Sequence, residues 1–160
     1  MKLHRSSQTN TPCPCGSVKQ IDVCCLPLIN GTKFAESAEQ LMRSRFVAFK
    51  IQSYRYVVDT YCQQESTKLN ENAIRQSNEG TKWLSLDVLA SDINTVEFKA
   101  WYQVGKSFYV LHETSNFVLE NKQWRYTDGY IHKDSGEVKP KRNDQCLCGS
   151  AKKFKKCCGS

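Results

Sequence analysis

The chain has 160 residues, of which 39% are hydrophobic, 11% aromatic and 24% charged. This length allows one ordinary domain, or a domain of about 100 residues with appendages, and excludes a large multidomain protein. The composition supports a globular core and excludes a disordered polymer. Nine cysteines and a net charge of +7 are the unusual features.

The basic excess lies at the two ends of the chain. Residues 1–35 carry 4 basic and 1 acidic side chains, residues 36–132 carry 11 and 12, and residues 133–160 carry 8 and 3. The middle is nearly neutral, as in a typical folded domain. No apolar run resembles a secretory signal or approaches the roughly 18 residues needed to cross a membrane. We therefore expect a cytoplasmic protein that does not associate with membranes.

Eight cysteines form two clusters of the same spacing, C-x-C-x8-C-C, 133 residues apart. Their members are Cys13, Cys15, Cys24 and Cys25 in the first cluster, and Cys146, Cys148, Cys157 and Cys158 in the second. Four thiolates in so short a segment match the closed tetrahedral site of structural zinc, which would supply the folding energy that a small module lacks. A turn or helix start must then aim the adjacent cysteines at one ion. We predict two structural zinc sites.

Three other uses of these thiols are open. Disulfides require an oxidising compartment, for which nothing in the sequence argues. Adjacent cysteines beside lysines act as redox sensors in some proteins. Iron–sulfur clusters also take four cysteine ligands. A reducing compartment favours metal binding over disulfides.

The second cluster encloses a basic insert with a central aromatic residue, formed by Lys152, Lys153, Phe154, Lys155 and Lys156. With Gly-Ser after its second cysteine, this segment resembles the SEC-C motif, the zinc-binding tail of the bacterial preprotein translocase SecA. The resemblance implies a partner-binding role for these five residues. The partner it implies is an acidic protein such as the chaperone SecB, or the ribosome. The first cluster is similar, but Lys19 is its only basic residue.

Two such motifs around a middle domain of about 100 residues resemble the bacterial YchJ family. Residues 41–49 are similar to that family's Met-Arg-Ser-Arg-aromatic-x-Ala-Phe helix, and residues 117–129 to its closing hairpin. The resemblance implies a nuclear transport factor 2-like cone, a fold that often contains a pocket. It does not define an activity.

The middle of the chain changes its apolar period once. Spacings of three and four over residues 36–61 predict one helix, or two that break near Gln52 and Ser53, and a polar helix is expected over 68–79. After Gly80 the period is two, which predicts strands near 84–88, 96–102, 108–110, 117–119 and 124–126. Helices before an antiparallel meander indicate an α+β fold, with the helices packed on one face of a curved antiparallel sheet.

These patterns divide the chain into five parts. We expect a flexible tail over 1–12, a zinc module over 13–30, the cone-like domain over 31–132, a linker over 133–145 and a second zinc module over 146–160.

Three charged residues are candidates for a pocket or an internal ion pair. Arg45 lies on the apolar line of the first helix, Asp128 shares strand parity with Trp124 and Tyr126, and Glu113 follows an expected strand. Buried charges need partners whether or not they take part in chemistry, so a structural pair and a ligand-binding role are both open. No phosphate loop, HExxH motif, nucleophile elbow or kinase signature occurs, and we assign no catalytic residue.

Three functions follow. The first is a non-enzymatic zinc-binding protein whose basic C-terminal module binds another protein. The second is a small-molecule-binding or enzymatic cone, with the zinc modules as docking elements. The third, nucleic-acid binding through the basic ends, is disfavoured because the middle is neutral.

Overall fold

The structure is a computed structural model and describes residues 10–160, so the tail predicted over 1–12 lies largely outside the described residues. The elements in chain order are η1 (Ile21–Val23), α1 (Leu26–Ile29), α2 (Ala38–Lys50), α3 (Tyr54–Asp59), α4 (Gln63–Ser66), α5 (Glu71–Ser77), β1 (Thr81–Ser91), β2 (Thr95–Val104), β3 (Ser107–Glu120), β4 (Gln123–Ile131), β5 (Gly136–Val138) and η2 (Phe154–Lys156).

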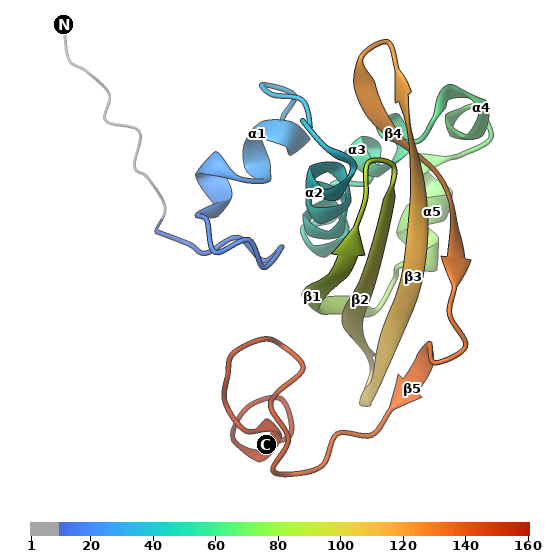
Figure 1. Cartoon of the computed structure of the whole chain (residues 1–160). Helices are drawn as coiled ribbons and strands as arrows, with labels where there is room; N and C mark the ends of the chain where they lie inside the picture. The colour runs from blue at the N-terminus through green and yellow to red at the C-terminus, as the bar shows by residue number, and fades with distance from the viewer. Residues whose placement is uncertain (1–9) are drawn as a thin grey trace, which may run out of the picture.

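The strands form one antiparallel sheet in the order β1-β2-β3-β4, with β5 paired to the start of β3 (Figure 1). Register shifts interrupt β1 and the β3–β4 pairing, and such irregularities bend and twist a sheet. Helix α2 packs across the sheet and contacts β1, β2 and β4. The predicted α+β fold, with helices on one face of a curved antiparallel sheet, is confirmed.

Helix α2 positions most of the side chains discussed below. Its start is fixed by Ser37, whose hydroxyl accepts a hydrogen bond from the Gln40 amide, as expected of an N-cap. It ends at Lys50, and Gln52 has a left-handed φ of 64° before α3 begins at Tyr54. The helix therefore breaks where the sequence predicted.

The core lies between α2 and the sheet. Its apolar members include Leu41, Phe46, Leu86, Phe98 and Phe117. Three cysteines of the first cluster belong to the same buried cluster of side chains, namely Cys13, Cys15 and Cys25. The N-terminal module is therefore packed into the core of the middle domain.

Two features of the sheet differ from the sequence prediction. Residues 107–120 form one long strand, whereas two short strands were expected. His112 and Glu113 are both buried, on opposite faces of the strand. Because they are polar, they interrupt the apolar alternation from which the strand was predicted. Residues 136–138 of the expected linker form β5, which completes the sheet beside β3.

Within residues 10–160, no helix has the length and apolar character of a membrane span.

Candidate metal centres

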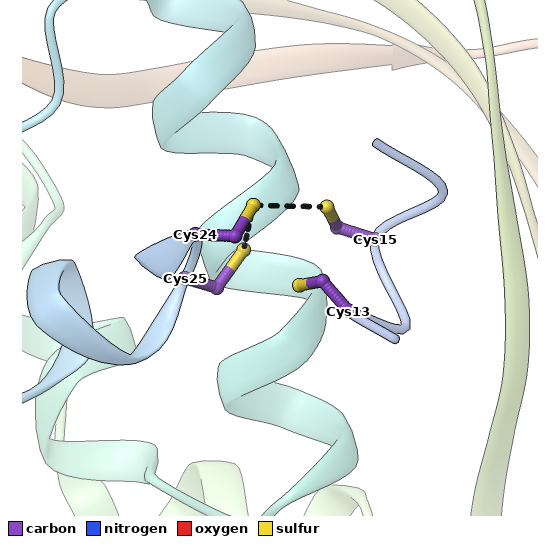
Figure 2. A group of neighbouring side chains, drawn as sticks. All are labelled: Cys13, Cys15, Cys24 and Cys25. Atoms are coloured by element: carbon purple, nitrogen blue, oxygen red, sulfur yellow. Dashed lines mark hydrogen bonds between the residues drawn. The ribbon is translucent and has the colours of Figure 1, made fainter. Parts of the chain in front are cut away.

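The four thiols of the first cluster converge on one point (Figure 2). Cys13 and Cys15 come from the turn before η1, and Cys24 and Cys25 from the junction of η1 and α1. The Sγ atoms of Cys15 and Cys24 are 3.6 Å apart, and those of Cys24 and Cys25 are 3.8 Å apart. Four sulfurs at zinc–sulfur bond length on a tetrahedron stand about 3.8 Å apart. The donor set therefore fits a tetrahedral ion such as zinc.

An unusual backbone at the first cysteine of each adjacent pair allows both sulfurs to reach one ion. Cys24 has φ −111° and ψ −94°, and Cys157 has φ −142° and ψ −112°, each directly after a short 3-10 helix. This turn places the sulfurs of both residues on one side of the chain. The sequence required such a turn, and the structure provides it in both clusters.

The two modules share one backbone. Gly16 and Gly149 have φ values of 79° and 76°, in the left-handed region that favours glycine. Two residues later, Val18 and Ala151 have φ values of 61° and 59°. Left-handed conformations at non-glycine residues are uncommon. Their recurrence at an offset of 133 residues shows that the repeat is structural.

The surroundings of the sulfurs are repeated as well. The Ser17 hydroxyl lies 3.1 Å from Cys24 Sγ, and the Ser150 hydroxyl lies 3.4 Å from Cys157 Sγ. A hydroxyl that donates to a metal-bound thiolate orients the ligand and stabilises its charge. The serine of each Gly-Ser pair therefore supports a ligand.

Two thiols of the second cluster have pKa values shifted in opposite directions. Burial raises the pKa of the Cys148 thiol, but hydrogen bonds with Ser150 and neighbouring thiols outweigh it and lower the pKa to about 6. Burial and the thiols of Cys146 and Cys148 raise the pKa of Cys158 to about 12. A divalent ion bound to all four sulfurs would remove this conflict, because metal binding deprotonates coordinating thiols.

Both modules lie against β1, the edge strand of the sheet (Figure 1). A Cβ built on Gly16 would stand 3.2 Å from the Leu86 carbonyl oxygen. From the other module, Leu147 accepts a hydrogen bond from the Ser85 hydroxyl at 2.6 Å. Residues of both clusters line one groove along β1. The two cysteine modules are therefore neighbours, although their cysteines are far apart in sequence.

Only part of the predicted partner-binding insert faces solvent. Lys152, Lys153 and Lys156 are exposed, and Lys155 is half-buried. The Phe154 ring makes an edge contact with Phe108, with 5.2 Å between centroids. Phe154 thus attaches the module to β3 while remaining half-buried, and its role in partner binding stays a prediction.

The structure brings two of the three predicted charged residues to one cavity. Arg45 and Glu113 are both buried and line a cavity between α2 and the sheet. They form no ion pair with each other, and the described residues contain none between Arg45 and Asp128. Asp128 is exposed, and its Oδ1 accepts a hydrogen bond from Asn116. The predicted internal ion pair is therefore absent, because β4 turns Asp128 outward.

A third group of donor atoms, from Glu97, His112 and His132, was not found from sequence. The two imidazole rings are stacked in parallel, 3.8 Å apart with 7° between their planes. A metal ion lies in the plane of an imidazole that binds it, so rings stacked in this way cannot share one ion. The alternation of residues along the strands gave no sign of this group. Its members meet only because β2 pairs with β3 and because His132, just after β4, stacks on His112.

The middle domain and the C-terminal cysteine module each match a known protein family. A model described as "YchJ, middle NTF2-like domain" matches residues 37–129, and the SEC-C motif matches residues 142–160. This chain belongs to the YchJ family. A UPF0225 protein of Shewanella sp. strain MR-4 is 39% identical over 161 residues, covering 91% of this chain and 94% of its own. One from Geobacter sulfurreducens is 38% identical over 157 residues, with 92% and 98% covered.

Two solved structures support the YchJ-family fold. A SEC-C motif-containing protein from Rhodopseudomonas palustris aligns with a TM-score of 0.71 at 32% identity, covering 77% of this chain and all of its own. Another from Psychrobacter arcticus aligns with a TM-score of 0.67 at 29% identity, covering 95% and 97%. The first cluster, outside the matched SEC-C segment, is related to the second by the shared backbone described above.

Proposed function

We propose that this YchJ-family protein is a non-enzymatic zinc-binding protein whose basic C-terminal module binds an acidic partner protein. Zinc is favoured because both clusters offer four sulfurs at tetrahedral spacing and leave no position open for a substrate. Free thiols are the form that binds metal, which suits a reducing, cytoplasmic location.

One observation carries the partner-binding proposal. The four lysines of the second module form no ion pair with any carboxylate of the described residues. The first module has the same backbone but only Lys19 in its insert. The lysines are therefore not needed for the fold of the module. A concentration of unpaired positive charge attracts a negatively charged surface.

Bound zinc changes the electrostatics but preserves this local charge. Four thiolates and one Zn²⁺ carry a formal charge of −2, so two loaded sites reduce the net charge from +7 to about +3. Attraction to a partner then depends on the local lysines more than on the whole chain. Such attraction weakens as salt increases.

The proposal is tested with the chaperone SecB, the acidic protein implied by the resemblance to SecA. One variant replaces Lys152, Lys153, Lys155 and Lys156 with glutamine. A matched control replaces four exposed lysines elsewhere, Lys33, Lys82, Lys106 and Lys122, so that both variants have the same net charge. We expect the zinc-loaded wild type and the control to bind SecB in fluorescence anisotropy, and the first variant to bind at least about tenfold more weakly.

Equal loss in the two variants would refute a local binding surface. A labelled single-stranded RNA serves as the second probe at about 50 mM salt. RNA binding with a steep salt dependence, in place of SecB binding, would favour the nucleic-acid alternative.

A further inference from the structure

A cavity of about 260 Å³ lies between α2 and the concave face of the sheet. Most of its wall is apolar and aromatic, with Phe46, Trp83, Phe98, Leu111 and Phe117 among the lining residues. Its size is slightly below that of the pockets that hold drug-sized ligands. The cavity is large enough for one molecule with a single ring.

Arg45 presents unused donors to this cavity. Its Nη1 donates to the Val57 carbonyl at 2.9 Å and to the Thr60 hydroxyl at 2.6 Å. The rings of Tyr61 and Tyr126 flank the guanidinium, with 4.5 and 4.6 Å from Cζ to the centroids. These contacts hold the charged group in place and leave Nε and Nη2 without a hydrogen-bond acceptor among the described residues. Among the described residues, every side-chain nitrogen that is fully enclosed has a hydrogen-bond partner. Since Nε and Nη2 have none, they are not fully enclosed, and a ligand can reach them.

Glu113 presents an unused acceptor to the same cavity. Its Oε1 accepts hydrogen bonds from the hydroxyls of Ser115 and Tyr126, both at 2.8 Å. Its Oε2 has no donor among the described residues, and no basic side chain there lies at ion-pairing distance. The carboxyl group is nevertheless buried, with 7% of the residue exposed. A Cβ on Gly129 would overlap with this carboxyl group, so the glycine leaves room for it.

The cavity therefore offers two donor nitrogens, Nε and Nη2 of Arg45, and one acceptor oxygen, Oε2 of Glu113. A buried charge without a partner costs free energy, so this arrangement favours a ligand that satisfies both groups. An anionic ligand would satisfy Arg45 but be repelled by Glu113, and a cationic ligand would meet the opposite problem. A neutral ligand with an acceptor beside a donor satisfies both.

We propose that this cavity binds a small, uncharged, planar molecule whose edge carries a carbonyl beside an N–H group, as in an amide or a lactam. The carbonyl accepts from Nε or Nη2 of Arg45, and the N–H donates to Oε2 of Glu113. The ring packs against the aromatic wall. None of the clustered cysteines or C-terminal lysines lines this cavity. Ligand binding in the cavity and protein binding by the C-terminal module can therefore be tested separately.

Three probes of nearly identical shape test the charge preference in the zinc-loaded wild type. Benzamide is neutral with an acceptor beside a donor, benzoate is an anion, and benzamidine is a cation. Affinities are measured from amide chemical-shift changes in NMR spectra, which also locate the probe. We expect benzamide to shift the signals of Trp83 and Tyr126 and to bind at least about fivefold more tightly than either ion.

A conservative variant distinguishes recognition from simple packing. In Glu113→Gln, the side-chain carbonyl still accepts from Ser115 and Tyr126, and the amide now points a donor into the cavity. We expect the preference to reverse in favour of benzoate. Ser115→Ala, which leaves Oε2 unchanged, is the matched control and should retain the wild-type order. Each variant is first compared with the wild type by its NMR spectrum to confirm folding.

Two results would overturn the proposal. The first is the absence of binding by all three probes to the folded wild type. The second is an order of affinities in which an ion equals or exceeds benzamide, or which does not change in Glu113→Gln.

Discussion

His112 lies between two carboxylates on the face of the sheet opposite α2. Its Nδ1 is 2.6 Å from Asp134 Oδ1, and its Nε2 is 2.8 Å from Glu97 Oε1. Both nitrogens must donate to satisfy these oxygens, which requires the protonated ring. Lys99 Nζ, 3.1 Å from Asp134, and the stacked His132 ring are the other titratable groups in contact with this cluster. The protonated His112 imidazole thus lies between the carboxylates of Glu97 and Asp134.

This environment makes the stability of the protein depend on pH. The hydrogen bond with Glu97 is the main cause that raises the pKa of His112 above its ordinary value, and Asp134 adds to it. A histidine whose pKa is higher in the folded than in the unfolded protein stabilises the native state when it is protonated. This contribution is complete at pH values below the pKa of the unfolded chain, about 6.5, and disappears as the pH rises through the pKa of the folded protein. We expect Glu97→Gln and Asp134→Asn each to lower the pKa of His112, in NMR titrations of the imidazole.

The free energy of unfolding, measured by urea denaturation, should be lower for His112→Gln than for the wild type. We expect this difference to be largest in mildly acidic solution. The difference should shrink as pH rises above the folded pKa of His112. A wild-type imidazole that titrates at or below the ordinary value would contradict this account.

At the scale of elements, the two cysteine modules cover the edge of the sheet at β1. A free edge strand exposes unpaired backbone groups and invites pairing with other chains. Along β1, Lys50 Nζ donates to the Trp83 carbonyl at 2.6 Å, Gly16 approaches the Leu86 carbonyl, and Leu147 bonds to Ser85. The modules therefore cover part of the outer edge of β1, the edge that does not pair with β2.

A matched pair of glycine substitutions measures this contact. Gly16 and Gly31 have nearly the same φ, 79° and 80°, so alanine at either position meets a backbone cost of about 1–2 kcal/mol. A Cβ at position 31 meets nothing within 4 Å, whereas one at position 16 crowds Leu86. We expect Gly16→Ala to lose about 1 kcal/mol more than Gly31→Ala in urea denaturation of the zinc-loaded protein. Equal losses would show that the module does not press on β1.

The elements that could be predicted from sequence are those with uninterrupted apolar periods. Helix α2 and strands β1, β2 and β4 show clear periods of 3.6 or 2, and the break predicted near Gln52 separates α2 from α3. Strand β5 is short and polar, and it depends on pairing with β3, so local sequence offered no signal for it. Arg45 was predicted to be buried because it lies on an apolar helical line, but its tyrosine and backbone partners depend on tertiary packing. The cysteine clusters were predictable because all four ligands lie close together in sequence.

At the scale of the whole molecule, two copies of one module contact β1 from either end of the middle domain, and each has a further attachment. The first copy shares the core of the cone through its buried cysteines, while the second is attached through Phe154 and Ser85. Metal binding to such modules is coupled to their folding. Removing metal from the first copy should therefore affect the core, and removing it from the second should mainly release the basic C-terminal module.

Metal content per chain is the most direct test of two structural zinc sites. The protein is purified without chelator or nickel affinity, and the wild type, Cys24→Ser and Cys157→Ser are compared by elemental analysis. Because the clusters have separate ligands, we predict two zinc ions per wild-type chain and one in each variant. Iron in place of zinc, or no metal together with thiols that cycle reversibly to disulfides, would contradict the account.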